Sequence, residues 1–260
     1  MAHYPCVDCC GEVVCIIFSD DFNRTDNDDL GAGWNEFVGN GLISGNVLSI
    51  DGSASDARIL ATAAVGGLGS GLGVSVRLRA DSGERIGVVL WDDASNYMEA
   101  TVRFSSSTTG GRLNFNYVNA SVIELSHSEE FECGANEHDI PDEGWATLTL
   151  EIHNCGGFGR YAGKVTLETA TETYAIGFQF VPAITIGFAG VMTEDTPTLA
   201  EFDDFEVYRM GSGCPSPMTC CNWGYEAIDA DFEHGGWDYD PGDWETEPIA
   251  CIPDFYVPAD

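Results

Sequence analysis

The sequence of 260 residues predicts an all-β protein folded as an antiparallel β-sandwich. Apolar and polar residues alternate with period two in many segments, as at 72–80, which is the pattern of a strand with one buried face. Strand-like segments recur about every ten residues and are separated by Gly, Asn, Asp and Ser, a spacing typical of sandwiches. No window combines a sustained helical period with helix caps. These three observations favour a sandwich over alternating strands and helices.

The expected strands follow one another along most of the chain. The first is the apolar run 13–18 (VVCIIF). Further strands are expected at 42–50, 57–62, 72–80, 85–92, 97–104, 112–118, 121–126, 145–153, 163–169, 173–180, 184–191 and 200–209. The glycine-rich segment 66–73 lacks the G-x-G-x-x-G spacing of a phosphate loop, so we expect a flexible connection there.

The charge balance is strongly acidic. Ten basic residues stand against 43 acidic ones, a net charge of −33. A nucleic-acid backbone and an anionic membrane surface would both be repelled, and no apolar run is long enough to span a bilayer. Self-repulsion also opposes close packing of copies, so assembly would need divalent cations, salt or covalent bonds.

Three segments resemble concanavalin A-like, laminin-G-type jelly rolls. The opening 20–24 (DDFNR), the later 43–46 (ISGN) before an apolar strand, and the closing 201–207 (EFDDFEV) carry the resemblance, which covers about 19–210. The resemblance implies a jelly roll of two curved antiparallel sheets with the first and last strands adjacent. Both tails would then leave from the same side of the domain.

This division gives three parts. Residues 1–18 form a cysteine-rich N-terminal segment, 19–210 the jelly roll, and 211–260 an acidic extension containing Cys and Trp. The apolar strand 13–18 could pair with an open sheet edge of its own domain or act as a donor strand to the next copy. Donation to a neighbour would propagate into a filament unless the rotation closes a ring.

Eight of the ten cysteines lie in the two tails. The full set is Cys6, Cys9, Cys10, Cys15, Cys133, Cys155, Cys214, Cys220, Cys221 and Cys251. We expect disulfides, within or between copies, and therefore an oxidising location: extracellular, cell-surface or in a virion. A zinc site of Cys6 and Cys9 with Cys220 and Cys221, or free buried thiols, are the alternatives.

Acidic residues supply candidate calcium ligands, and calcium is the expected cofactor. Related jelly rolls often hold calcium near the pairing of first and last strands, which here would use Asp20, Asp21, Asp203 and Asp204. The loop acids Asp26 and Asp28 are further candidates. The alternative is solvated loop charge. Asn23 and Asn119 fit the glycosylation acceptor pattern.

Glu201-x-Asp203-x-x-Glu206 matches the catalytic spacing of laminarinase-type glycoside hydrolases, which share the jelly-roll fold. Strand alternation places Glu206 on the opposite face from Glu201 and Asp203 unless a bulge intervenes. The motif also lies where the domain ends, so we expect no catalytic residues and no enzyme activity.

The leading hypothesis is a non-enzymatic extracellular structural protein. It would be a self-assembling subunit of a surface filament, appendage or particle coat, held by disulfides and helped by calcium. One alternative is a calcium-dependent carbohydrate-binding module in which Trp91, Tyr97 or Tyr117 stacks on sugars, although such aromatics more often belong to the core. The other is a glycoside hydrolase using Glu201 and Glu206. The expected partners are copies of the chain itself and glycans.

Overall fold

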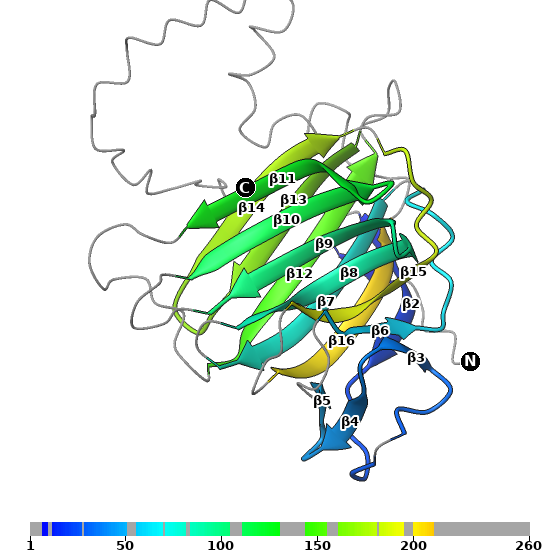
Figure 1. Ribbon diagram of the computed structural model, residues 1–260, viewed down its shortest axis with the longest axis vertical. Coiled ribbons are helices and arrows are strands. Elements are labelled where there is room, and N and C mark those ends of the chain that lie inside the picture. The colour runs from blue at the N-terminus through cyan, green and yellow to red at the C-terminus, as the bar shows by residue number, and fades with distance from the viewer. Residues whose placement is uncertain are drawn as a thin grey trace, which may run out of the picture. The chain divides into compact units, whose positions relative to one another are not determined.

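The computed structural model describes residues 7–9, 12–27, 29–50, 56–69, 71–81, 84–104, 111–130, 144–154, 161–180, 182–194 and 200–210. Only the backbone is described at 7–9, 12–14 and 127–130. These residues form two antiparallel sheets and contain no helix (Figure 1). The predicted all-β sandwich is confirmed.

The first sheet has nine strands among the described residues. In spatial order they are β1 (Val7–Cys9), β2 (Glu12–Asp20), β16 (Ala200–Met210), β7 (Gly71–Ala80), β12 (Ala146–Asn154), β13 (Tyr161–Glu168) and β14 (Thr173–Phe180). The hairpin of β4 (Gly41–Ser44) and β5 (Val47–Ile50) joins this sheet through the pairing of β5 with β16.

The second sheet has seven described strands. In spatial order they are β11 (Val122–Glu130), β10 (Arg112–Asn119), β9 (Asn96–Arg103), β8 (Arg85–Asp93), β15 (Phe188–Glu194), β6 (Arg58–Ala61) and β3 (Trp34–Val38). In Figure 1 they follow one another from β11 at the upper left to β3 at the lower right.

The core lies between the two sheets. Val74 and Val76 of β7 and Val88 and Leu90 of β8 are fully buried, as period-two alternation requires. At the far end, Phe115 of β10 stacks on Phe178 of β14 with ring centroids 3.6 Å apart. A Cβ on Gly163, which faces Phe178 across the β13–β14 pair, would meet the Phe178 ring. Glycine there therefore makes room for the aromatic stack.

The first long strand and the last strand are neighbours, as the jelly-roll resemblance implies. β2 pairs antiparallel with β16 from Asp20 opposite Phe205 to Val14 opposite Met210. The expected boundary between 18 and 19 lies within β2, which continues to Asp20 past an irregularity in its pairing between Val207 and Tyr208. The division of the chain into three parts stays a prediction. Of the two pairings open to 13–18, the structure has the one within its own chain.

The opening motif 20–24 fixes the start of the sandwich. The Asp20 carboxylate accepts hydrogen bonds from Phe22 N (2.8 Å), Arg24 Nη1 (2.7 Å) and Trp34 Nε1 (2.7 Å). Trp34 belongs to β3 of the other sheet and packs against Phe22 and Phe205. One carboxylate thus ties β2 to the opposite layer.

Two expected strands differ from those observed. The segment 42–50 is a hairpin, because Gly45 and Asn46 both have positive φ (62° and 66°) and form a tight turn between β4 and β5. Of 184–191, only the part from Phe188 onward is strand. The backbone carbonyls of Ile186 and Gly187 instead accept hydrogen bonds from the loop residues Gly67 and Val65, respectively. Gly187 N donates to Trp91 O of β8.

All described residues belong to one compact unit, Met1–Cys214. The predicted extension 211–260 lies outside the described residues. No helix long and apolar enough to cross a membrane occurs in the part of the chain that the structure describes.

Candidate functional site

The strongest candidate is the outer face of the seven-stranded sheet, which points away from the core. Alternation along β8 sends Val88 and Leu90 into the core, and Val89 and Trp91 into a separate apolar cluster on the outer side. Because of the cross-strand register, the outward-facing residues of neighbouring strands form rows that run across the sheet. The row at one end of the strands contains arginines, and the row at the other end contains aromatic rings.

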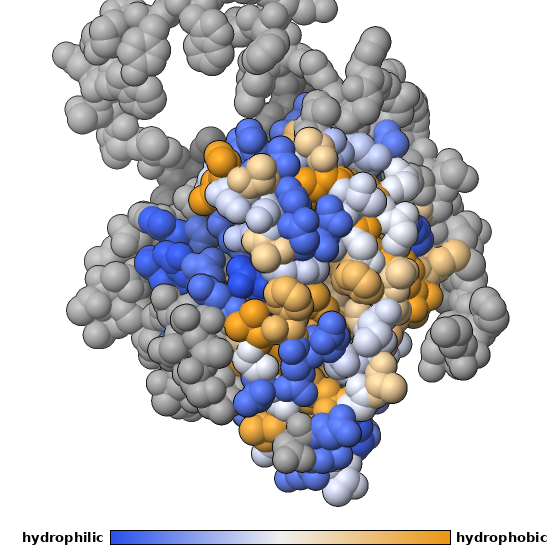
Figure 2. All heavy atoms as spheres, turned by 45° about the vertical axis from the view of Figure 1, so that its right-hand side comes forward, coloured by the Kyte–Doolittle hydropathy of each residue, from blue (hydrophilic) through white to orange (hydrophobic). Residues whose placement is uncertain are grey.

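The aromatic patch consists of Phe37, Trp91, Tyr97 and Phe188. Trp91 is stacked on Tyr97 (centroids 5.5 Å) and contacts Phe37 (5.1 Å), and Phe188 lies opposite Trp91 in the ladder. Phe37 is 49% exposed and Phe188 38% exposed, whereas Trp91 is buried. Figure 2, in which the side of β3, β6 and β15 comes forward, shows hydrophobic residues gathered across this side between hydrophilic ones. The patch therefore presents apolar ring surface to solvent.

Arg58 joins the aromatic patch to the polar part of the face. Its guanidinium carbon lies 5.4 Å from the Trp91 ring centroid and 5.1 Å from that of Tyr97. Such cation–π contacts stabilise an arginine by about 0.5–2 kcal/mol, depending on solvent exposure. Arg58 Nη1 also donates to Asp56 O at 3.0 Å, which fixes the orientation of the side chain.

Glu99 is a buried carboxyl at the centre of the face. It is only 6% exposed, and its Oε1 accepts a hydrogen bond from Asn116 Nδ2 at 2.9 Å. Asn116 Oδ1 in turn accepts from Ser126 Oγ at 2.8 Å. Burial raises the pKa of Glu99, and the hydrogen bond from Asn116 only partly opposes this. Burial, with the Glu99 charge, also raises the pKa of Tyr97.

Glu99→Gln should make the protein more stable at pH 7 and leave it unchanged below about pH 4, where the carboxyl is protonated in both states. Because the folded pKa is raised, the unfolded chain releases its proton first as pH rises. The stability that the Glu99 carboxyl contributes to the wild-type protein is therefore fully present below the pKa of the unfolded chain. It is lost as the pH rises from there through the pKa of the folded protein. Urea unfolding of both proteins across this pH window tests the prediction, with exposed Glu124→Gln as the control. A stability difference independent of pH would contradict it.

A row of three arginines crosses the other end of the face. Arg103 of β9 lies directly opposite Arg85 of β8 and Arg112 of β10. Arg85 Nη1 is paired with Glu194 Oε2 of β15 at 2.6 Å. The next row holds Thr101 opposite Asn114.

The hydrolase-like motif lies on the outer face of the other sheet. A bulge between Asp203 and Glu206, where Asp204 has φ 47°, shifts the register. Glu201, Asp203 and Glu206 therefore all point to one side, as the sequence allowed only with a bulge. Glu201 is in an ion pair with Arg79, and Asp203 with Arg77 at 3.4 Å. Burial and the Asp204 charge raise the pKa of Asp203.

Four of the six predicted calcium ligands accept hydrogen bonds within the protein, and no such bond is seen for the Asp204 carboxylate among the described residues. Asp20 is fully engaged as described above, Asp21 Oδ1 accepts from Asn23 N (3.1 Å), and Asp26 Oδ1 accepts from Gly45 N (2.9 Å). Asp203 Oδ1 likewise accepts from Asp204 N (3.0 Å). Asp28 lies outside the described residues. Among those described, no three Asp, Glu, His or Cys side chains are grouped to hold a metal. Calcium binding stays a prediction.

Cys15 of β2 is disulfide-bonded. The side chains of the other cysteines lie outside the described part of the chain, so the remaining pairings stay predictions. Asn23 is exposed and Asn119 partly exposed, and glycosylation of either is untested.

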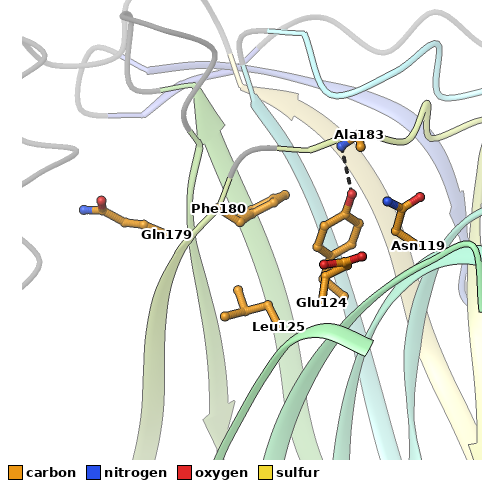
Figure 3. Close-up of a pocket in the computed structure, with 7 residues that line it drawn as sticks. Asn119, Glu124, Leu125, Gln179, Phe180 and Ala183 are labelled. Carbon is orange, nitrogen blue, oxygen red and sulfur yellow. Dashed lines mark hydrogen bonds between the residues drawn. The ribbon is translucent and has the colours of Figure 1, made fainter. Parts of the chain in front are cut away.

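A cavity of about 340 Å³ opens at the end of the sandwich between β10, β11 and β14 (Figure 3). Its wall contains Tyr117, Phe180 and Leu125 beside polar Asn119, Glu124 and Gln179. The Tyr117 hydroxyl accepts a hydrogen bond from Ala183 N at 2.8 Å.

Of the aromatics named from the sequence as sugar-stacking candidates, Trp91 and Tyr117 are buried and Tyr97 is partly exposed.

The sequence interpretation missed Glu99, Asn116 and the arginine row. The signal was available in the alternation of β8, β9 and β10, where every second residue from Arg85, Tyr97 or Arg112 falls on the outer face. Polar and charged residues recur at outward positions on solvated faces as well as on functional ones. The two kinds of face can be distinguished only when the strand order is known.

No protein-family model matches the sequence, and no curated protein sequence matches it. Its structure is similar to that of a legume lectin-like domain from Entamoeba histolytica, with a TM-score of 0.51 and 11% identity over 69% of this chain and 91% of that one. It is also similar to winged bean acidic lectin complexed with methyl-α-D-galactose, with a TM-score of 0.52 and 10% identity over 77% of this chain and 100% of that one. A xylan β-1,4-xylosidase from Bacillus halodurans aligns with a TM-score of 0.47 and 16% identity, over 73% of this chain and 38% of that one. The likeness to the two lectin structures identifies the fold: the chain is a concanavalin A-like jelly-roll sandwich.

Proposed function

We propose that this protein is a carbohydrate-binding module whose ligand lies against the outer face of the seven-stranded sheet. The observation that carries the proposal is the combination of exposed aromatic rings with a buried, oriented Glu99–Asn116 pair on one sheet face. Ligand sites typically combine aromatic surface with a few fixed polar groups.

The chemistry of the face suits a sugar. The apolar side of a sugar ring can lie on the ring surfaces of Phe37, Tyr97 and Phe188. The Tyr97 ring is already held in place by its contacts with Trp91 and Arg58. Hydroxyl groups can donate to Glu99 and exchange hydrogen bonds with Asn116. The lectin-like fold supports this choice, since the similar winged bean lectin is described as bound to methyl-α-D-galactose.

We further propose binding without hydrolysis. Glu201, the residue that a laminarinase-like mechanism would need, forms an ion pair with Arg79 of the neighbouring strand β7, and both belong to the nine-stranded sheet, not to the candidate face. An extracellular location is supported by the disulfide at Cys15, because disulfides persist in oxidising compartments. Self-assembly into a filament stays a prediction, which non-reducing gels and electron micrographs of purified protein would test.

Phe37→Ala and Tyr97→Ala should each weaken glycan binding by about threefold to tenfold, because each removes ring surface that contributes roughly 0.5–1.5 kcal/mol to an aromatic contact. A glycan array first identifies a ligand, and calorimetry with that ligand compares the variants. Leu42→Ala is the matched control, since Leu42 is an exposed apolar residue of β4 in the other sheet. Equal affinity of all three variants would contradict the assigned face. Release of reducing sugar that Glu201→Gln abolishes would establish the hydrolase instead.

A further inference from the structure

The cavity between β10, β11 and β14 lies on the core side of its sheet and is separate from the candidate face. Its apolar wall consists of Tyr117, Leu125 and Phe180. Tyr117 lies opposite Leu125 in one ladder and opposite the core residue Met98 in the other. The rings of Tyr117 and Phe180 are tilted against each other with centroids 5.6 Å apart, and the hydrogen bond from Ala183 N fixes the Tyr117 hydroxyl. The apolar wall is therefore rigid.

A β-bulge places Glu124 at this cavity. Tyr117 pairs with Leu125 and Val118 with Ile123, so Glu124 has no residue opposite it in β10. In a regular strand, neighbouring side chains point to opposite faces, yet Glu124 and Leu125 both line the cavity. Bulges re-aim side chains in this way and are frequent beside functional sites. Figure 3 shows the Glu124 carboxylate among the side chains that line the cavity.

The turn between β10 and β11 holds the rim of the cavity in place. Ala120 and Ser121 form a two-residue turn with φ of 48° and 64°, a conformation that favours glycine and asparagine. Such backbone strain persists only where the surroundings fix the chain. Here Asn96 Oδ1 accepts from Ala120 N at 2.9 Å, and Ser95 O accepts from Ser121 N at 2.8 Å. The hairpin is therefore anchored to the β8–β9 turn.

The charge of the cavity favours a cation. Glu124 is the charged member of the lining, and Asn119 and Gln179 add amide groups. Among the described residues, none forms a side-chain hydrogen bond or ion pair with these three side chains, so their polar atoms are open to a ligand. The net charge of −33 attracts cations and repels anions. An ammonium group can donate charge-assisted hydrogen bonds to the carboxylate, and neighbouring aromatic rings stabilise it further.

We propose that this cavity binds a small organic ammonium ligand, with the positive group at Glu124 and the carbon skeleton against the apolar wall. Its volume of about 340 Å³ is near the lower end of the range of ligand pockets, about 300–1,000 Å³, and suits one small molecule rather than a polymer. The inference goes beyond the proposed function and does not rest on it, because the two sites share no residue.

The test uses two pairs of compounds that differ in charge. Choline is compared with its uncharged carbon isostere dimethylbutanol, and glucosamine with N-acetylglucosamine. At about pH 6 the primary amine is protonated and an ordinary carboxyl is ionised. Calorimetry or an NMR titration is made at about 0.15 M salt, which screens the net charge of the protein beyond about 8 Å. The wild-type protein should bind the charged member of at least one pair about tenfold more tightly, and Glu124→Gln should lose this preference.

Glu168→Gln is the matched control, since it makes the same change of charge. Glu168 is exposed and lies opposite Thr173, at the other end of β14 from Phe180. This variant should keep the preference of the wild-type protein. An equal loss in both glutamine variants would trace the preference to net charge and overturn the inference, as would a preference that persists in Glu124→Gln.

Preference for choline over dimethylbutanol supports a quaternary ammonium ligand, and preference for glucosamine over its N-acetyl form supports an amino sugar. Equal binding of the charged and uncharged members of both pairs by the wild-type protein overturns the inference, as does the absence of binding to all four compounds. Neither result requires a variant to fold. The glycan array and the Phe37→Ala comparison test the outer face separately, so either proposal can fail while the other holds.

Discussion

Asp20→Ala is expected to lower the free energy of unfolding by about 3 kcal/mol, because it removes a largely buried carboxylate that accepts three hydrogen bonds. The Asp20 side chain is 13% exposed and accepts from the guanidinium of Arg24 and the indole of Trp34. Its removal leaves the Trp34 indole N–H without this acceptor beside the aromatic cluster, reduces Arg24 to its hydrogen bond with Leu30 O, and releases β2 from the opposite sheet. Chemical denaturation with a common slope measures the loss.

Asp21→Ala is the matched control for this substitution. Asp21 is exposed and accepts only the backbone N–H of Asn23 among the hydrogen bonds described. Its replacement should cost less than about 1 kcal/mol. If both alanine variants lose the same stability, the carboxylate of Asp20 does not tie the two sheets together.

Phe178→Ala should cost about 3–5 kcal/mol, the range for truncating a buried phenylalanine. Phe178 is fully enclosed and its ring lies on Phe115 of the other sheet at 3.6 Å between centroids. The cavity left behind would separate the two layers at the end where β14 has no further neighbour in the described sheet. Thermal and chemical unfolding should agree on the loss.

Phe188→Ala provides the comparison within the same residue type. Phe188 is 38% exposed on the outer face, so its truncation should cost less than about 1.5 kcal/mol. A loss for Phe178→Ala no larger than that for Phe188→Ala would mean that the inter-sheet stack contributes nothing beyond surface burial.

The strands were predictable because burial on one side imposes alternation. β7, β12 and β14 appear close to their expected limits for this reason. The hairpin at Gly45 and Asn46 was missed because apolar residues on both sides read as one continuous strand. From the sequence, the Asp203–Glu206 bulge could be stated only as the condition for placing Glu206 on the same face as Glu201. A single residue that adopts positive φ leaves no periodic signal.

The candidate face was less accessible to sequence reasoning than the fold. Glu99 and Asn116 are 17 residues apart in the chain and meet only through the register of β9 and β10. The three arginines likewise come from three strands. Strand order and register are long-range properties, whereas alternation is local, so composition pointed toward the tails and away from this face.

The adjacency of β2 and β16 has a consequence for how the domain is displayed. The first described strand, β1, forms a hairpin with β2 at the edge of the sheet, and β16 ends beside β2, with Met210 opposite Val14. Both strands belong to the layer that faces away from Glu99 and the arginines. A tether at either terminus of the sandwich would therefore attach to the nine-stranded layer, and the face proposed to bind carbohydrate would point away from the anchoring point.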